Sequence, residues 1–206
     1  DMSDYMTEYK RWLDCGDNDE RLELKGLTED QIKERFYTDL EFGTAGMRGI
    51  IRTGTNGMTC RTVSRATLGL AEYIKSCGPE AASKGVVISY DSRLKSAEFA
   101  SLTARVLAQA GVKAILYDAL RPVPLLSFGV RYFKAFAGVM ITASHNPKEY
   151  NGYKVYGEDG AQLAPEAAAE VLKEINKLDY FSIPCADMEQ ALSQGMIVLA
   201  LSLIHI

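Results

Sequence analysis

Short apolar runs alternate with amphipathic segments through the middle of the chain. Apolar runs at 85–90, 112–117 and 137–142 predict three buried strands, and the segments 96–110 and 123–133 have the spacing of helices. Strands and helices that alternate in this way form right-handed βαβ units. The pattern therefore predicts an α/β fold, a three-layer α/β/α domain in which helices cover both faces of a mainly parallel mixed sheet.

Helical spacing also marks the segments that flank this core. Two amphipathic N-terminal helices are predicted at 4–14 and 28–39, the second beginning with Thr28 and Gln31 as a capping box. We expect them to pack against the body without a chemical role. Helices are also predicted at 59–76, 165–178 and 188–194, and short antiparallel strands at 153–156 and 161–163.

The length of 206 residues suits one domain, or one domain and part of a second. We expect an N-terminal helical extension at 1–39, a principal domain at 40–181, and a linker with the start of a second domain at 182–206. The tail 201–206 breaks the expected pattern, so we interpret it as truncation or a sequencing artefact. His205 is accordingly a poor catalytic candidate.

The composition, 47% hydrophobic and 24% charged, is that of an ordinary soluble protein. The acidic, polar N-terminus does not resemble a signal peptide, and the longest apolar run, 196–206, has 11 residues where a membrane helix needs about 20. We therefore predict a cytoplasmic protein that does not bind membranes. The four cysteines are scattered, so reduced thiols are expected rather than a zinc site or disulfides.

The net charge of −4 is unevenly distributed along the chain. Residues 1–41 carry 13 acidic and 6 basic side chains, a net of −7, which leaves 14 acidic and 17 basic side chains in 42–206, a net of +3. The overall acidity argues against nucleic acid as a partner. The mildly basic body suits a small anionic ligand.

The first candidate for chemistry lies where the third core strand ends. The apolar run Val139–Thr142 leads into Ala143–Pro147, a cluster of small, polar and turn-forming residues. Pro147 biases Asn146 away from helical dihedral angles, so Ser144 should be held in a fixed conformation. Because ligands bind at the carboxyl ends of parallel strands, Ser144 is the first candidate for chemistry.

Other candidates are weaker on pattern alone. The segment Leu40–Gly49 contains three glycines that let the backbone approach an anion, and Arg48 has a guanidinium suited to phosphate. A flexible turn with a surface arginine is nevertheless the favoured interpretation. Lys154 likewise reads as a surface lysine on a strand. Asp91 and Arg93 read as a salt bridge that anchors a loop, with direct participation in the site as the alternative.

Three motifs carry a family resemblance. TASHNP at 142–147 and NGYKVY at 151–156, with FGTAGMRG at 42–49 upstream, resemble the α-D-phosphohexomutases of the phosphoglucomutase and phosphomannomutase type. The resemblance covers about Leu40 to Phe181, the first of the family's four domains. It implies that Ser144 exchanges a phosphoryl group with a sugar phosphate, most closely glucose phosphate, and so moves phosphate between C1 and C6.

The resemblance also implies roles for individual residues. Arg48 corresponds to the active-site arginine beside the phosphoserine, and Lys154 to a fixed charge that aids proton transfer. His145 corresponds to a hydrogen-bonding partner of the phosphate or sugar. It is not expected to act as the general base for Ser144, because the side chains of adjacent residues in an extended chain point to opposite sides. Arg48, Ser144 and His145 would bind glucose 1,6-bisphosphate, which is the activator and intermediate.

Mg²⁺ is the metal that the resemblance implies, with Ser144 as one ligand through its phosphate or hydroxyl oxygen. The other ligands would belong to an aspartate-rich loop of the second domain. We expect this chain to lack domains II–IV of its parent, including the sugar-recognition loop and the distal phosphate site. Its partners would be a small-molecule sugar phosphate and those domains, and the chain alone should be inactive, or nearly so, as a mutase.

One position departs from the resemblance, and several alternatives stay open. An arginine is expected after Asn56, where this chain has Gly57, although Arg52 and Arg61 could compensate.

The alternative functions were compared by their motifs. This chain lacks the GxSxG elbow and the credible second histidine of a serine hydrolase, and it lacks the glycine fingerprint of a dinucleotide-binding domain. A sugar-phosphate-binding domain without catalysis, or a phosphomannomutase or phosphopentomutase specificity, are the remaining alternatives.

Overall fold

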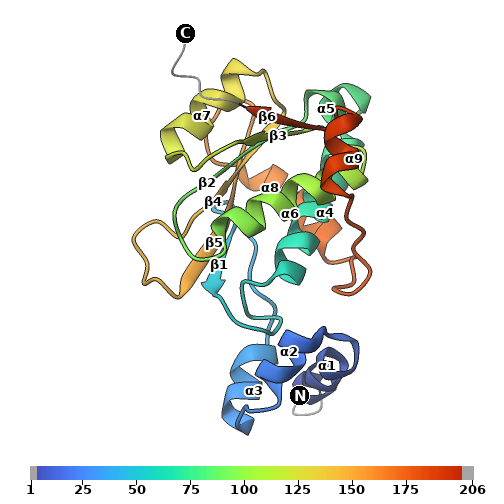
Figure 1. Ribbon diagram of the computed structural model, residues 1–206, viewed down its shortest axis with the longest axis vertical. Helices are drawn as coiled ribbons and strands as arrows, with labels where there is room; N and C mark the ends of the chain where they lie inside the picture. The colour runs from blue at the N-terminus through green and yellow to red at the C-terminus, as the bar shows by residue number, and fades with distance from the viewer. Residues whose placement is uncertain (1–3, 201–206) are drawn as a thin grey trace.

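The structure, a computed structural model, describes residues 4–200 (Figure 1). Its sheet has the strand order β1-β5-β4-β2-β3-β6. Strand β2 runs parallel to β3 and β4, and β3 runs parallel to β6, whereas β5 runs antiparallel to β1 and β4. The predicted mainly parallel mixed sheet is confirmed. The strands are β1 (Met47–Ile50), β2 (Val86–Tyr90), β3 (Ala114–Tyr117), β4 (Ala137–Ile141), β5 (Tyr150–Tyr156) and β6 (Ile197–Ala200).

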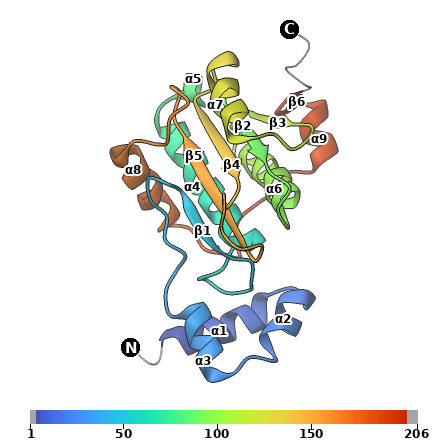
Figure 2. The ribbon, with the colours of Figure 1, turned by 90° about the vertical axis from the view of Figure 1, so that its left-hand side faces the viewer.

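Helices cover both faces of the sheet, as Figures 1 and 2 show from two sides. In the central strand β2, Val86 and Ile88 point into the larger apolar core, and Val87 points into the smaller one. Burial of these two faces drives the three-layer arrangement. The larger core lies under α4 (Cys60–Ser76), α5 (Pro79–Lys84), α6 (Ser96–Gln109), α8 (Pro165–Ile175) and α9 (Met188–Ser193), and the smaller under α7 (Val123–Tyr132).

Two helices and two strands, β1 and β6, are additions to the sequence prediction. Helix α2 (Asn18–Leu24) begins with a capping box formed by Asp17 and Glu20, a signal present in the sequence but followed by only a short helix. Helix α5 is also short and begins at a proline. Strand β1 lies in the glycine-rich segment, where its strand conformation depends on pairing with β5 rather than on its own composition.

Other predictions differ from the structure in their boundaries. Helix α3 (Glu29–Phe36) has the predicted Thr28 and Gln31 capping box but ends before residue 39. The predicted strand at 161–163 is wrong, because this segment forms only an isolated bridge between Tyr156 and Gln162. Helix α8 begins at Pro165, only three residues after Gln162, which leaves too little chain for a ladder.

The segment after α8 forms helix α9 and then strand β6, which joins the same sheet. Strand β6 pairs with β3, and Ile197 and Ala191 are buried in the larger core. The expected boundary at residue 182 stays a prediction. The expectations for the tail 201–206 and for His205 lie outside the described residues.

The N-terminal helices α1 (Asp4–Cys15), α2 and α3 form a small core of their own beside the sheet domain (Figure 1). Trp12 is fully buried at its centre, and its ring lies 5.4 Å from that of Tyr180. Tyr180 belongs to the segment that follows α8, so this core contains side chains from both ends of the domain. Apolar packing therefore fixes the helices to the body.

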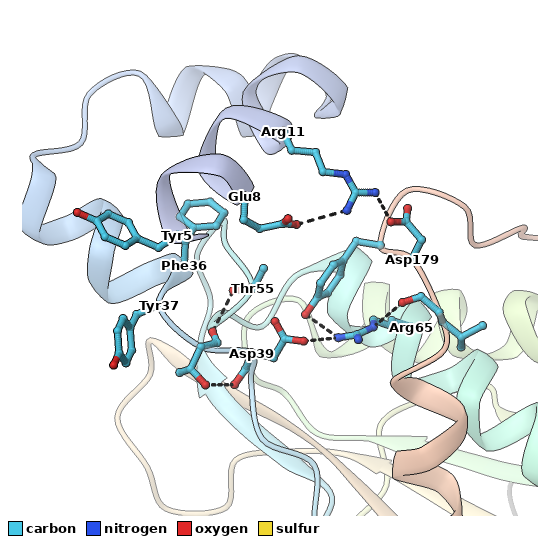
Figure 3. Close-up of a pocket in the computed structure, with 12 residues that line it drawn as sticks. Tyr5, Glu8, Arg11, Phe36, Tyr37, Asp39, Thr55, Arg65 and Asp179 are labelled. Atoms are coloured by element: carbon cyan, nitrogen blue, oxygen red, sulfur yellow. Dashed lines mark hydrogen bonds and ion pairs between the residues drawn. The ribbon is translucent and has the colours of Figure 1, made fainter. Parts of the chain in front are cut away.

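Ion pairs line the seam between these helices and the body. Arg11 of α1 pairs with Asp179, and Arg65 of α4 donates to Asp39 at 2.7 Å and to the Tyr180 hydroxyl at 2.8 Å. Figure 3 shows these arginines directed toward their carboxylates around a hollow of about 520 Å³. Arg65 of the body thus offsets one carboxylate of the acidic N-terminal segment, whereas Arg11 of that segment pairs with a carboxylate of the body.

The loop around Gly57 faces the same seam. A Cβ atom on Gly57 would lie 2.0 Å from the carbonyl oxygen of Arg52, so an arginine there would require the backbone to shift. Arg52 donates to Glu34 at 2.9 Å, and Arg61 makes a bidentate contact with Glu20. Both arginines thus form ion pairs with the N-terminal helices, and their compensation for the missing arginine stays a prediction.

Glu23 of α2 makes the stability of this seam depend on pH. Its carboxylate accepts hydrogen bonds from Arg35 and from the hydroxyl and N–H of Thr53. Burial alone would raise the pKa of Glu23, but these hydrogen bonds outweigh it and hold the pKa below its ordinary value. The stabilisation by Glu23 is therefore present above the unfolded-state pKa of about 4.3 and is lost as the pH falls through the folded-state pKa.

We expect the substitution Glu23→Gln to lower the free energy of unfolding at pH 7 by about 1–2 kcal/mol, because the charge-assisted hydrogen bonds weaken at a partly exposed site. The difference from the unmodified chain should shrink toward pH 3. Urea unfolding at pH 7, 5, 4 and 3 measures it, with Glu80→Gln on α5 as an exposed control. Parallel pH curves for the Glu23→Gln and unmodified chains would contradict the assignment.

Candidate active site

Ser144 lies in the loop after β4, with its side chain exposed and a backbone φ of 56°. This left-handed conformation costs a residue other than glycine roughly 1–3 kcal/mol, so surrounding contacts must hold it. The N–H of Ser144 donates to Thr142 Oγ1 at 2.9 Å, and the Thr142 hydroxyl donates to Asp91 at 2.6 Å. The contacts that support this conformation come from Thr142 and Asp91, and not from the Asn146 and Pro147 turn on which the prediction rested.

Lys154 of β5 is the direct neighbour of the serine hydroxyl. Its Nζ atom donates to Ser144 Oγ at 2.7 Å. The pKa of Lys154 is lowered by burial first and by the charge of Arg48 second, while Asp91 opposes these effects. Lys154 lies opposite Met140 of β4 in the register, which brings an ammonium group to the loop that follows β4.

Arg48 reaches the same loop from β1. It lies opposite Gly152 of β5, and its Nη1 atom donates to Asn146 Oδ1 at 2.8 Å. The preceding turn depends on Gly46, whose φ is 77° and where a Cβ atom would lie 1.9 Å from the carbonyl oxygen of Tyr153. Close packing of the glycine turn on β5 therefore sets the position of Arg48.

Ser144 and Lys154 line two different hollows of the surface. One, of about 700 Å³, is lined by Ser144 and Asn146 together with the loop at 91–94. The other, of about 600 Å³, is lined by Arg48, Lys154 and the glycine turn. The hydrogen bond from Lys154 to Ser144 Oγ joins a residue of one hollow to a residue of the other. A nucleophilic oxygen beside two cationic side chains suits a phosphate or another small anion.

The sequence was also compared with known proteins. Residues 39–181 match the family described as phosphoglucomutase/phosphomannomutase, alpha/beta/alpha domain I. The chain belongs to this family. The phosphohexomutase resemblance predicted from the three motifs is thereby confirmed.

Its relatives are longer phosphohexomutase-type proteins. A Staphylococcus epidermidis phosphoglucomutase is 48% identical over 166 residues, which cover 79% of this chain and 30% of the relative. A probable phosphoribomutase of Schizosaccharomyces pombe is 47% identical over 134 residues, covering 65% of this chain and 23% of the relative. The chain thus spans less than a third of the length of these two relatives.

Solved structures show the same fold. The crystal structure of a putative phosphomannomutase from Thermus thermophilus matches with a TM-score of 0.58 and 30% identity, covering 80% of this chain and 33% of that one. A Paramecium phosphoglucomutase, parafusin, matches with a TM-score of 0.59 at 16% identity, covering 80% and 34%, which supports the fold alone.

Three of the four candidate site residues of this phosphohexomutase domain are connected by hydrogen bonds, and the fourth is not. Ser144, Lys154 and Arg48 are joined by hydrogen bonds to each other or to the same loop. His145 follows Ser144 and is exposed, and within residues 4–200 no hydrogen bond or ion pair involves its side chain. A hydrogen-bonded pair of Ser144 and His145 is therefore absent from the described part of the chain, and the ligand-binding role of His145 stays a prediction.

The metal prediction can be compared with the donor atoms. Among residues 4–200, no group of three or more His, Cys, Asp or Glu side chains could hold a metal ion. The exposed oxygen of Ser144 is compatible with the role of a single ligand, and the Mg²⁺ site stays a prediction. The described helices also include none long and apolar enough to cross a membrane.

Sequence reasoning missed two residues that organise the phosphohexomutase loop. Thr142 accepts from the Ser144 N–H, and Asn146 accepts from Arg48. Both lie within the TASHNP motif, so their polar side chains beside the serine were the available signal. The predicted contact between Asp91 and Arg93 is confirmed, with Nε and Oδ2 at 3.6 Å.

Proposed function

We propose that this chain is the phosphoserine domain of a phosphohexomutase that interconverts glucose 1-phosphate and glucose 6-phosphate. The observation that carries the proposal is the 2.7 Å contact between Lys154 Nζ and the exposed Ser144 Oγ, with Arg48 on the same loop. Phosphoryl transfer needs positive charge around the transferred group and an oxygen in line with it. These three side chains supply both requirements.

In the forward half-reaction, the phosphoryl group of phospho-Ser144 passes to the free hydroxyl of a glucose monophosphate. A bond forms between the sugar oxygen and phosphorus, and the bond from phosphorus to Ser144 Oγ breaks. The proton of the sugar hydroxyl passes to solvent water, and the departing Ser144 oxygen takes a proton from the Lys154 ammonium, which solvent water then restores. Lys154 stabilises the negative charge that develops on Ser144 Oγ, and Arg48 binds equatorial oxygens of the phosphoryl group. The reverse step, with the other phosphate of the bisphosphate, restores phospho-Ser144.

Mg²⁺, when bound, supplies further positive charge against the phosphoryl oxygens. Ser144 is proposed as its one ligand from this chain, and an aspartate-rich loop of a second domain as the source of the others. Sugar recognition and the distal phosphate site are likewise assigned to domains II–IV. The chain alone is therefore proposed to capture a phosphoryl group while turning over sugar phosphate slowly or not at all.

Three sugars are candidates, each supported by a different relative. Similarity to a relative named phosphoglucomutase at 48% identity supports glucose. The relative named a probable phosphoribomutase, at 47% identity, supports pentose phosphate as a second candidate. A phosphomannomutase specificity is a third, from the structural match.

The test is incubation of the purified chain with glucose 1,6-bisphosphate and Mg²⁺, followed by intact mass measurement and peptide mapping. We expect one phosphoryl group on the peptide that contains Ser144. A parallel sample joined to the remaining length of a phosphoglucomutase relative supplies the other domains. If neither protein gains a phosphoryl group at Ser144, the mutase proposal is wrong.

A further inference from the structure

Arg93 follows strand β2 and turns its guanidinium to the loop that carries Ser144. One of its terminal nitrogens, Nη2, donates to the carbonyl oxygens of Ser144 at 2.6 Å and Asn146 at 2.7 Å. The other, Nη1, donates to the carbonyl oxygens of Pro147 at 2.9 Å and Tyr150 at 3.2 Å. A single side chain therefore contacts four carbonyl groups across the loop from β4 to β5.

Asp91 holds Arg93 in place and fixes the other side of the serine. Its carboxylate accepts a hydrogen bond from the backbone N–H of Arg93 at 3.0 Å. The same carboxylate lies 3.6 Å from Nε of the Arg93 guanidinium. The same carboxylate accepts the hydroxyl of Thr142, which itself accepts the N–H of Ser144. The peptide groups before and after Ser144 are thus both tied to the 91–93 segment.

These contacts explain how the exposed serine keeps an unfavourable backbone conformation. The N–H of Ser144 is held through Thr142 and Asp91, and its carbonyl through Arg93. Rotation of the loop to a more common conformation would break both contacts and move the hydroxyl relative to Lys154. Most of the Arg93 side chain is buried, with 15% exposed, so the contacts are partly shielded from competing water.

We propose that Arg93 is a positioning residue for phosphoryl transfer, holding Ser144 in its left-handed conformation through the loop carbonyls. Its assignment to a reaction rests on the proposed function. A guanidinium has five N–H donors. Four face the carbonyl groups and the Nε donor faces Asp91, so none is directed at a ligand. Arg93 therefore acts through the loop and not as a phosphate ligand.

The first measurement does not require phosphoryl transfer. In an Arg93→Met chain, we expect amide hydrogen exchange at Ser144, measured by NMR, to become at least about tenfold faster, because the loop loses its anchor. Arg121→Met is the matched control, since Arg121 is similarly buried and donates to a carbonyl, that of Leu120, but lies after β3. Unchanged exchange at Ser144 in Arg93→Met would overturn the proposal.

The second measurement is the rate of phosphoryl capture from glucose 1,6-bisphosphate. We expect Arg93→Met to lower the maximal rate by about 10- to 100-fold, while the bisphosphate concentration giving half the rate stays within about twofold. Arg93→Lys should recover part of the rate, because an ammonium group has three donors for four carbonyl groups. A large rise in the half-saturating concentration would make Arg93 a ligand-binding residue and overturn the positioning role.

The two measurements separate the inference from the proposed function. If the unmodified chain captures no phosphoryl group, the proposed function fails, and hydrogen exchange still decides whether Arg93 holds the Ser144 conformation. If Arg93→Met does not fold, as judged by circular dichroism, the same two comparisons are made with Arg93→Lys.

Discussion

A Ser144→Ala chain is expected to gain no phosphoryl group from glucose 1,6-bisphosphate under conditions that phosphorylate the unmodified chain. Alanine removes the only atom of residue 144 that can bond to phosphorus, and it leaves the backbone hydrogen bond to Thr142 intact. The fold should be unaffected, because the Ser144 side chain is exposed. Intact mass and peptide mapping measure the loss directly.

Ser92→Ala is the matched control for this substitution. Ser92 is also exposed and lines the same hollow as Ser144, so it reports on phosphorylation that depends only on access. The Ser92→Ala chain should gain the phosphoryl group as the unmodified chain does. Full phosphorylation of the Ser144→Ala chain would transfer the proposed role to another residue.

A Lys154→Met chain is expected to capture phosphoryl groups about 10²- to 10³-fold more slowly. Methionine keeps much of the side-chain volume, but it removes the charged donor 2.7 Å from the oxygen on which charge changes during transfer. Removal of one pre-organised donor from an active site commonly costs this much. Quenched-flow sampling with phosphopeptide quantification gives the rate.

Two further variants make the Lys154 result specific. Lys148→Met removes a lysine that is exposed on the Ser144 loop, and we expect less than a threefold change in rate. Lys154→Arg keeps the charge with a different geometry and should retain more activity than Lys154→Met. Equal rates for the Lys154→Met and Lys148→Met chains would refute a specific role for Lys154.

The central fold was predictable because its signals are local. Each apolar run of the βαβ core contains enough β-branched residues to identify a strand, and the helices between them end at glycine or lead into the next run. Strand β1 was not predictable in this way. Its four residues include an arginine and a glycine, which interrupt the apolar pattern of a buried strand. Its structure depends on β5, about a hundred residues later in the chain.

The site was predictable only in part for a related reason. Ser144 and its loop follow from the motif and the strand that precedes it. The contact of Lys154 with Ser144 depends on the antiparallel pairing of β5 with β4, and the placement of Arg48 depends on a third strand. The carbonyl contacts of Arg93 are less predictable still, because backbone acceptors leave no trace in residue identity.

The shared core around Trp12 sets a limit on how this protein can be trimmed. The family match begins at residue 39, yet Tyr180 near its end packs against Trp12 in the N-terminal helices. A fragment cut to 39–181 would place the Tyr180 ring in water and leave the β3 edge without β6. The family match, residues 39–181, is therefore shorter than the segment that should be expressed to obtain a stable domain that does not aggregate.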